Sequence, residues 1–194
     1  PRRIEPGPGI RSGLRGLPRR LNPATVGAGV VAAVARDGKL VYFEALGQRD
    51  LQTRDPMPED ALFRLYSMTR SITSTSVMML WEEGKFQLDD PIATYLPQFT
   101  DQRVFIDASA PDLSKTRARR GDITVRHLLT HTSGIDGDHF LDTGRGDDAL
   151  AAYVASCADL PQQFPVGSSH SYCNAGFSIA GRVLEVVTGR VGDT

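Results

Sequence analysis

The chain has 194 residues, and 40% of them are hydrophobic, which is enough for the core of one ordinary domain. Its 22 Lys and Arg against 23 Asp and Glu leave a net charge of −1, which argues against a surface built for nucleic acid or for anionic membranes. The longest apolar run, residues 27–34, is too short to span a bilayer.

The cysteine content and the N-terminus give information about the cellular compartment of the protein. Cys157 and Cys173 could form a disulfide, but free thiols in a reducing compartment fit the sequence better. No signal peptide is visible, and the chain starts at Pro1 rather than at methionine, so earlier processing is an open alternative. We therefore expect a cytoplasmic protein, or a periplasmic one if a signal has been removed.

The first elements of the chain are an arm and a hairpin. Residues 1–23 are rich in arginine and proline without an apolar period, which predicts an arm on the surface. A nucleic-acid role for this arm is an alternative, although the aromatic residues that would interleave with its charges are absent. Residues 26–36 and 39–45 flank Asp37-Gly38, a dipeptide that favours a tight type I′ turn, so this region predicts a β-hairpin.

A serine lies at the start of the next predicted element. Residues 62–66 predict an extended, apolar lead into a helix that runs from Ser67 to about Glu83 and ends at Gly84. Ser67 there has two interpretations. It is a good helix cap, and it is also well placed for a nucleophile, because unpaired N–H groups and the helix dipole favour negative charge. Arg70 follows one turn later on the same face.

The interior of this helix is rich in small hydroxyl residues, which are poor helix formers. We therefore expect packing to hold the helix, which predicts that it is closely buried between other elements. The small residues are Ser71, Thr73, Ser74, Thr75 and Ser76, and the apolar face comprises Met68, Ile72, Met79 and Leu80.

The rest of the sequence predicts short helices separated by polar loops. An acid before Pro91 marks a helix start, and we expect this short helix to reach Leu96 and to end at Pro97. Residues 107–122 predict a solvated loop, and Thr124 is the predicted cap of the next helix. Further on we expect a helix to Leu129, a loop at 134–146, a helix at 147–158, an irregular segment at 161–172, and an amphipathic helix at 174–188 that ends at Gly189.

His127 and His131 lie four residues apart on a predicted helix, which is the spacing of a zinc-ligand pair. The zinc-protease pattern also requires a glutamate after the first histidine, where this sequence has Leu128, and no third ligand has a compelling position. Packing or local hydrogen bonding of the imidazoles is the simpler interpretation. The acids between residues 136 and 148 do not follow calcium-loop spacing. We expect no metal and no other cofactor.

Four short motifs occur in an order that is typical of one known superfamily. They are Ser67-Met68-Thr69-Arg70, Leu88-Asp89-Asp90-Pro91, HLLTHTSGI at 127–135, and Tyr172-Cys173-Asn174. From residue 26 to residue 189 the chain resembles the serine β-lactamase-like superfamily: class C β-lactamases, D-alanyl-D-alanine carboxypeptidases and family VIII carboxylesterases. Together the ordered matches favour the nucleophile interpretation of Ser67 over the helix cap.

The resemblance implies an α+β fold, in which an antiparallel sheet flanked by helices accompanies a mostly helical domain. Residues 1–23 would be an N-terminal arm, residues 24–66 the first part of the sheet domain, and residues 67–194 the nucleophile helix and the helical domain. In the superfamily a third motif, the last strands and a C-terminal helix follow the helix that ends here at Gly189. We therefore expect a second polypeptide segment to complete the sheet and the pocket, because a lone hairpin leaves a bare edge.

The resemblance also implies a serine hydrolase. Ser67 would attack the substrate carbonyl to form an acyl-enzyme, and its backbone N–H would supply half of an oxyanion hole. Tyr172 would accept the serine proton and later return a proton to the leaving group, while Asn174 would contact the substrate or hold this network in place. The expected substrates are short-chain carboxylic esters, with β-lactams as a second option, and we expect neither nucleic acid nor membrane as a partner.

Arg70 departs from the superfamily, which has lysine at this position. A lysine can lose its proton and shuttle protons, whereas an arginine stays charged. Arg70 can favour the deprotonated form of Tyr172, but its larger planar group can displace Ser67 or Tyr172, so we expect a slowed hydrolase. One alternative is a non-catalytic or penicillin-binding relative that is acylated without turnover. Another is a metal-dependent hydrolase that uses His127 and His131.

Overall fold

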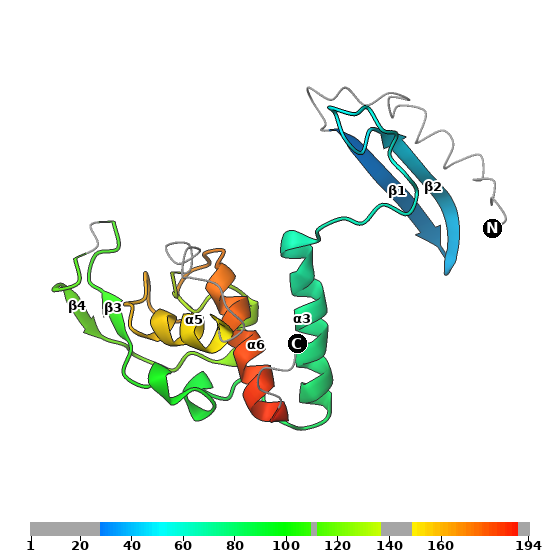
Figure 1. The fold of residues 1–194 in the computed structure, drawn as a ribbon. Helices are drawn as coiled ribbons and strands as arrows, with labels where there is room; N and C mark the ends of the chain where they lie inside the picture. Colours follow the sequence, from blue (N-terminus) through cyan, green and yellow to red (C-terminus); the bar gives the residue numbers. More distant parts are fainter. Residues whose placement is uncertain (1–27, 110–111, 137–148, 190–194) are drawn as a thin grey trace. The chain divides into compact units, whose positions relative to one another are not determined.

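The computed structural model describes residues 28–109, 112–136 and 149–189 (Figure 1). The chain divides into two compact units, Pro1–Arg64 and Leu65–Thr194. The predicted N-terminal arm, most of the predicted loop at 134–146 and the first two residues of the predicted helix at 147–158 lie outside the described residues. None of the described helices is both long enough and apolar enough to cross a bilayer.

The first unit contains the predicted hairpin, which is confirmed. Strand β1 (Gly29–Arg36) pairs antiparallel with strand β2 (Lys39–Gly47). The turn between them places Asp37 and Gly38 at positive φ, 51° and 71°, as a type I′ turn requires at both central residues. Residues 50–60 contain neither a helix nor a named strand.

This unit has no core of its own in its described part. None of its residues from 28 to 64 is buried, and Val34, Leu40 and Phe43 are exposed apolar side chains on the hairpin. An isolated two-stranded hairpin is marginally stable in water. The hairpin therefore needs further surface to pack against.

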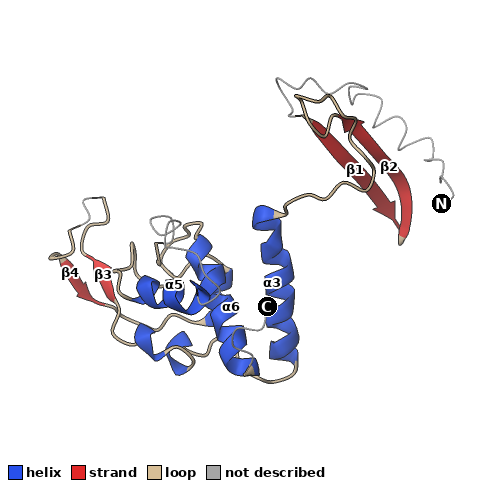
Figure 2. Ribbon diagram, in the orientation of Figure 1, coloured by secondary structure: helices blue, strands red, loops and turns tan. Residues whose placement is uncertain are grey.

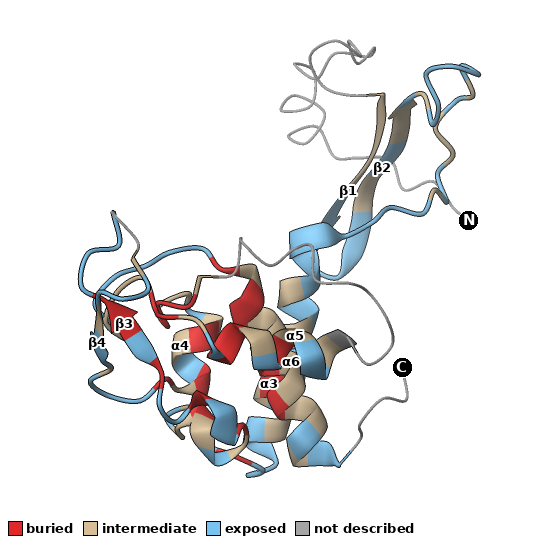
Figure 3. Cartoon of the chain, turned by 60° about the vertical axis from the view of Figure 1, so that its left-hand side comes forward, coloured by how far each residue is buried: buried red, intermediate tan, exposed pale blue. Residues whose placement is uncertain are grey.

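The second unit is mostly helical (Figure 2). A 3-10 turn, η1 (Tyr66–Met68), leads into α3 (Thr69–Glu82), and α4 (Val125–Leu129), α5 (Ala149–Ala158) and α6 (Asn174–Thr188) follow. Helix α6 contacts α3, α4 and α5, and α3 lies beside it (Figure 1). The buried core includes Val77 from α3, Leu128 from α4, Val154 from α5 and Ile179 from α6 (Figure 3). Helix α6 is thus the element on which the other three helices pack.

Two predicted helix ends rest on glycine and are confirmed. Helix α3 ends with Glu83 as its C-cap and Gly84 at a φ of 71°, and α6 ends at Gly189 with a φ of 69°. Glycine is favoured at such positions because it adopts the left-handed conformation without a Cβ clash.

The predicted short helix that reaches Leu96 is wrong in type. The segment forms two 3-10 turns instead, η2 (Ile92–Thr94) and η3 (Pro97–Phe99), and each of them buries an apolar side chain. Pro97 has no N–H to donate to a carbonyl one turn earlier, so an α-helix cannot continue through it and a new turn begins there.

The prediction of a solvated loop over residues 107–122 is wrong in part. Strand β4 (Thr116–Ala118) pairs antiparallel with β3 (Arg103–Phe105). Arg103 donates from Nε to the Thr116 hydroxyl (2.6 Å) and from Nη2 to the Thr116 carbonyl (2.9 Å). A strand of three mostly exposed residues shows no alternation of apolar and polar positions, so its sequence does not reveal it.

Helix α3 packs on one face only, so the prediction that it is closely buried between other elements is wrong for the described part of the chain (Figure 3). On the predicted apolar face, Met68, Ile72 and Met79 are 69%, 58% and 57% exposed. The small hydroxyl groups do not require neighbouring elements, because several donate to carbonyls one turn earlier in the same helix. These are Thr73, Thr75 and Ser76.

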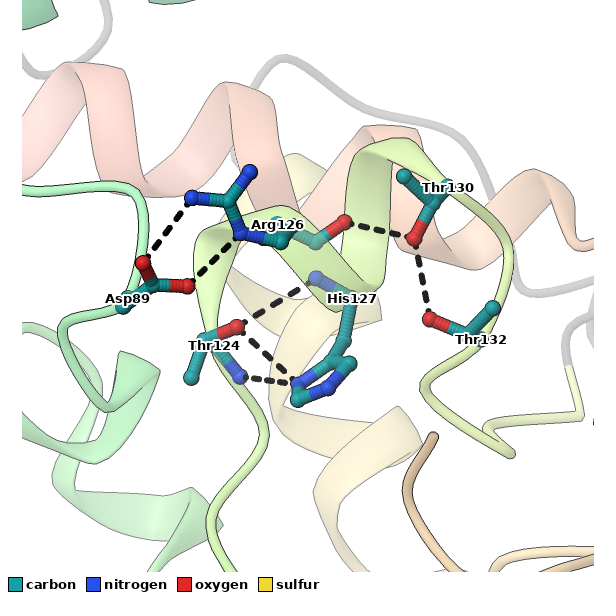
Figure 4. A network of polar contacts seen from close by, with 6 residues as sticks. All are labelled: Asp89, Thr124, Arg126, His127, Thr130 and Thr132. Atoms are coloured by element: carbon teal, nitrogen blue, oxygen red, sulfur yellow. Dashed lines mark hydrogen bonds and ion pairs between the residues drawn. The ribbon is translucent and has the colours of Figure 1, made fainter. Parts of the chain in front are cut away.

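A polar network fixes the start of α4 (Figure 4). Thr124 caps the helix as predicted: its hydroxyl accepts from the His127 N–H, and its own N–H donates to His127 Nδ1 (3.1 Å). Arg126 donates through two nitrogens to the carboxylate of Asp89 (2.7 and 2.9 Å), and these bonds hold the pKa of Asp89 below its usual range. The network ties α4 to the segment that follows α3.

Candidate active site

Ser67 lies in the turn η1, immediately before α3, and is exposed. Neither η1 nor α3 has a side-chain hydrogen bond at its N-cap, so the interpretation of Ser67 as a helix cap is wrong. The preceding residue, Tyr66, has a φ of +45°, a conformation that costs a bulky residue on the order of 1 kcal/mol or more. The chain therefore presents Ser67 at a strained bend.

The hydroxyl of Tyr172 lies against Ser67, although the two residues are 105 positions apart in the sequence. It donates a hydrogen bond of 2.8 Å to Ser67 Oγ. Tyr172 belongs to the irregular segment before α6, and its side chain is 50% exposed. The two oxygens are close enough for direct proton transfer.

Arg70 contacts both Tyr172 and Asn174. Its guanidinium donates to Oδ1 of Asn174. Its Cζ atom lies 4.2 Å from the centre of the Tyr172 ring and 5.3 Å from that of Phe177. Nε and Nη1 are buried and have no hydrogen-bond partner among the residues that the structure describes. The cation is thus held by one amide oxygen and two aromatic rings.

The start of α6 positions two of the predicted site residues. Asn174 is the first residue of the helix, and the N-cap Cys173 accepts through Sγ from the N–H of Gly176 (3.4 Å). Tyr172 directly precedes this cap. The structure therefore brings Ser67 from the turn η1 and Arg70 from α3 together with Tyr172 and Asn174 at the start of α6.

A pocket of about 600 Å³ lies between α3 and α6, which is within the range of small-molecule sites. Ser67, Arg70 and Asn174 line it together with the apolar side chains of Leu150 and Phe177. The candidate nucleophile is thus part of the wall of a cavity with both polar and apolar lining.

His131 also belongs to this site, although no motif in the sequence predicts its place there. Its ring centre lies 4.8 Å from that of Tyr172, and its Nδ1 accepts from the N–H of Cys173 (3.1 Å). Burial, followed by electrostatic interactions with Arg70 and His170, lowers the pKa of His131. No local sequence signal marks the contact with Tyr172, because it is a tertiary one.

The two histidines with zinc-ligand spacing have separate backbone partners. His127 Nδ1 accepts from the N–H of Thr124, and burial lowers the pKa of His127. His131 Nδ1 accepts from Cys173. Within residues 28–109, 112–136 and 149–189, no group of three or more His, Cys, Asp and Glu side chains could hold a metal ion. This part of the chain gives no geometric support to the metal-dependent alternative.

Residues 19–192 match the profile of the family described as Beta-lactamase. The chain is 38% identical over 165 residues to Penicillin-binding protein 4 of Amycolatopsis lactamdurans, and 34% identical over 177 residues to Esterase EstB of Burkholderia gladioli. Its structure is similar to that of EstCE1, a hydrolase with promiscuous acyltransferase activity, with a TM-score of 0.67 at 26% identity. The chain belongs to the Beta-lactamase family of serine hydrolases, which confirms the resemblance inferred from its motifs.

These matches extend over most of this chain but over less than half of each relative. They cover 85% and 84% of the chain, but 40% of Penicillin-binding protein 4 and 41% of Esterase EstB. The match to EstCE1 covers 93% of the chain and 46% of that structure. The chain therefore spans about two fifths of the length of these curated relatives. Its fold is β-lactamase-like, and the described residues supply helices and two-stranded antiparallel sheets.

Proposed function

We propose that this chain carries the nucleophile of a serine hydrolase that acts through an acyl-enzyme on short-chain carboxylic esters. The observation that carries the proposal is the 2.8 Å hydrogen bond between Tyr172 and Ser67 Oγ, with the Arg70 guanidinium over the same tyrosine ring. A serine is a weak nucleophile until a neighbouring base takes its proton. The hydroxyl of Tyr172, 2.8 Å from Ser67 Oγ, is within reach for this role, which supports Tyr172 as the base.

The proposed reaction has two halves. In the first, Ser67 Oγ attacks the ester carbonyl while its proton passes to the deprotonated Tyr172. The alcohol then leaves with that proton, and the acyl group stays on Ser67. In the second half, a water molecule gives its proton to Tyr172 and attacks the acyl carbonyl. The carboxylic acid leaves, the proton returns to Ser67 Oγ, and the site is restored.

Arg70 supplies part of the charge that this reaction requires. Lowering the pKa of a phenol from about 10 to about 7 takes roughly 4 kcal/mol. Arg70 Cζ lies 4.2 Å from the Tyr172 ring centre, and a cation this close to a phenolate favours the deprotonated form. Because Tyr172 is 50% exposed, water screens this interaction. The arginine therefore provides only a share of the activation, in keeping with a slowed hydrolase.

Asn174 fits a supporting role in this scheme. Its side-chain oxygen accepts from Arg70, and this bond holds the guanidinium beside Tyr172. Loss of the Asn174 side chain would leave the guanidinium held only by the rings of Tyr172 and Phe177. We assign Asn174 to the network that orients Arg70, next to the substrate pocket that both residues line.

We also propose that a further polypeptide segment completes the sheet and the pocket. The relatives are longer than this chain, the described part of the hairpin unit has no buried residue, and α3 exposes Ile72 and Met79. Exposed apolar surface of this kind marks a place where another surface packs. In this arrangement residues 24–66 belong to a sheet domain and residues 67–194 to a helical domain. Cooperative unfolding and full activity of residues 1–194 alone would contradict it.

The relatives support two substrate classes. Esterase EstB and the hydrolase EstCE1 favour esters. Penicillin-binding protein 4 favours the alternative, a protein that β-lactams acylate without turnover. The observation that favours this alternative is Arg70, because an arginine cannot relay a proton to the deacylating water as a neutral lysine can.

One set of assays separates these functions. The intact protein is incubated with p-nitrophenyl acetate and butyrate, and separately with a fluorescent penicillin and a fluorophosphonate probe, with Ser67→Ala as the control. Ester turnover that Ser67→Ala abolishes supports the hydrolase. Stable penicillin acylation of Ser67 without ester turnover favours the alternative. If mass spectrometry finds no adduct on Ser67 with any reagent and no ester is hydrolysed, both proposals fail.

A further inference from the structure

His131 holds the chain on both sides of Tyr172. Its carbonyl oxygen accepts from the N–H of Ser171 (3.0 Å), and its imidazole Nδ1 accepts from the N–H of Cys173 (3.1 Å). Its ring also lies 4.8 Å from the ring of Tyr172, at an interplanar angle of 34°. Three contacts from one residue thus fix the backbone and the ring of the tyrosine whose hydroxyl reaches Ser67.

His131 is itself fixed by the end of α4. It follows the C-cap residue Thr130, has a φ of +58°, and donates its N–H to the carbonyl of Leu128 (3.3 Å). A residue other than glycine keeps such a conformation only where its surroundings hold it, although asparagine tolerates it well. The ion pair of Arg126 with Asp89 anchors the same helix (Figure 4).

The contact with Cys173 requires a neutral imidazole. A proton on Nδ1 would turn this acceptor into a donor facing another donor, and the hydrogen bond would be lost. Burial and the positive charge of Arg70 lower the pKa of His131, so the ring is neutral at neutral pH. The groups that face the ring are two cationic or titratable side chains and two aromatic rings: Arg70, His170, Tyr172 and Phe177.

We propose that His131 is a positioning residue, which aligns the Tyr172 hydroxyl with Ser67 by holding the N–H groups of Ser171 and Cys173, and which releases Tyr172 when it is protonated. The inference rests on the proposed hydrolase function. It adds to that function a second group, besides Tyr172, that must be deprotonated for acylation of Ser67. His131 acts through Tyr172 and takes no part in the bond changes.

A pair of amide variants tests the role of the Nδ1 acceptor. In His131→Asn the amide oxygen lies the same number of bonds from Cα as Nδ1, so the acceptor is kept and the titration is removed. In His131→Gln the amide lies one carbon further out, so the acceptor at that place is lost. The control is His170→Gln, which removes a neighbouring imidazole without touching the N–H groups beside Tyr172. The rate of Ser67 labelling by a fluorophosphonate probe is measured on the intact protein from about pH 5 to about pH 9.

In the wild-type protein we expect the logarithm of the rate to fall at acid pH with a slope steeper than one, since Tyr172 and His131 both take up protons. His131→Asn should keep most of the rate at about pH 8 and lose the steep part of this slope. His131→Gln should be about tenfold slower than His131→Asn, which corresponds to one hydrogen bond of ordinary strength. His170→Gln should keep the steep slope. Equal slopes in the wild type and His131→Asn, or equal rates in the two variants, overturn the proposal.

An NMR titration separates this inference from the proposed function. In the Ser67→Ala protein, the imidazole of His131 and the amide of Cys173 are followed by ¹⁵N spectra as the pH is lowered. The amide resonance of Cys173 is expected to shift with the titration of His131. If wild-type Ser67 is not labelled at all, the proposed function fails and this titration decides the inference: an unmoved Cys173 amide refutes it. The same measurement decides if His131→Gln does not fold.

Discussion

The guanidinium carbon of Arg70 lies 4.2 Å from the centre of the Tyr172 ring. A cation at this distance is attracted to the face of a neutral tyrosine and more strongly to a phenolate. The contact therefore favours the form of Tyr172 that can take a proton from Ser67. Arg70 cannot act as a second proton carrier beside Tyr172, because its guanidinium remains protonated.

Replacement of this arginine tests how much it slows the site. We expect Arg70→Lys to raise the rate of p-nitrophenyl butyrate hydrolysis by about tenfold or more, because a lysine adds a group that can carry protons. The matched control is Arg126→Lys, since Arg126 pairs with Asp89 away from Ser67 and should leave the rate unchanged. An unchanged or lower rate in Arg70→Lys would show that the arginine does not slow the hydrolysis.

Removal of the Tyr172 hydroxyl tests the base. In Tyr172→Phe the ring contacts with Arg70 and His131 remain, but the oxygen 2.8 Å from Ser67 is lost. We expect the rate of Ser67 acylation to fall about 100-fold or more. Tyr95→Phe is the control: its hydroxyl donates to Asp90 (2.7 Å), so its loss should cost about 1 kcal/mol of stability and no activity. Normal acylation in Tyr172→Phe would exclude Tyr172 as the base.

The stability of the fold should depend on pH through His127. Burial lowers its pKa below the ordinary 6.5, so the unfolded chain takes up this proton at higher pH than the folded chain. The contribution of His127 to the free energy of unfolding is therefore expected to be complete above pH 6.5 and to be lost as the pH drops below 6.5. Denaturant titrations of the intact protein at several pH values should show a shallower fall in His127→Asn. If the free energy of unfolding falls equally in the wild type and in His127→Asn, His127 is not the source of this pH dependence.

Two leucines allow a matched test of the core of the helical unit. Leu128 in α4 is 0% exposed, whereas Leu113 is 70% exposed. We expect Leu128→Ala to lower the free energy of unfolding by about 2–5 kcal/mol, and Leu113→Ala to change it by no more than about 0.5 kcal/mol. Urea denaturation of the intact protein measures both changes. Similar losses in the two variants would mean that α4 does not pack as described.

The parts of the fold that the sequence predicts are those marked by backbone chemistry. Asp37-Gly38 requires positive φ at both positions, and Gly84 and Gly189 end helices, so these boundaries are read from single residues. Strand β4 has no such marker, because its three residues are held by pairing with β3 and by Arg103. The exposure of the apolar face of α3 cannot be predicted from the sequence either, since an apolar pattern does not show which other element packs against it.

The candidate site likewise combines residues that the sequence marks with contacts that only the fold reveals. The helix start predicts Ser67 as a candidate, and the ordered motifs bring in Tyr172 and Asn174, but no local pattern joins residues 105 positions apart. The role of His131 was missed because its contacts with Ser171 and Cys173 arise from a left-handed residue just after α4. Its spacing from His127 fits a metal pair, but the sequence favours packing or local hydrogen bonding, and in the structure each imidazole accepts from a different peptide N–H.

The buried nitrogens of Arg70 have a consequence for how this protein can be improved. Nε and Nη1 find no acceptor among the described residues, and a buried donor without an acceptor costs about 1–3 kcal/mol. A side chain with fewer donors at position 70 would remove that cost while changing the charge beside Tyr172. Lysine has fewer donors than arginine, so Arg70→Lys is expected to raise the thermal stability as well as the rate of ester hydrolysis, and a selection for heat-resistant variants should recover substitutions of Arg70 early.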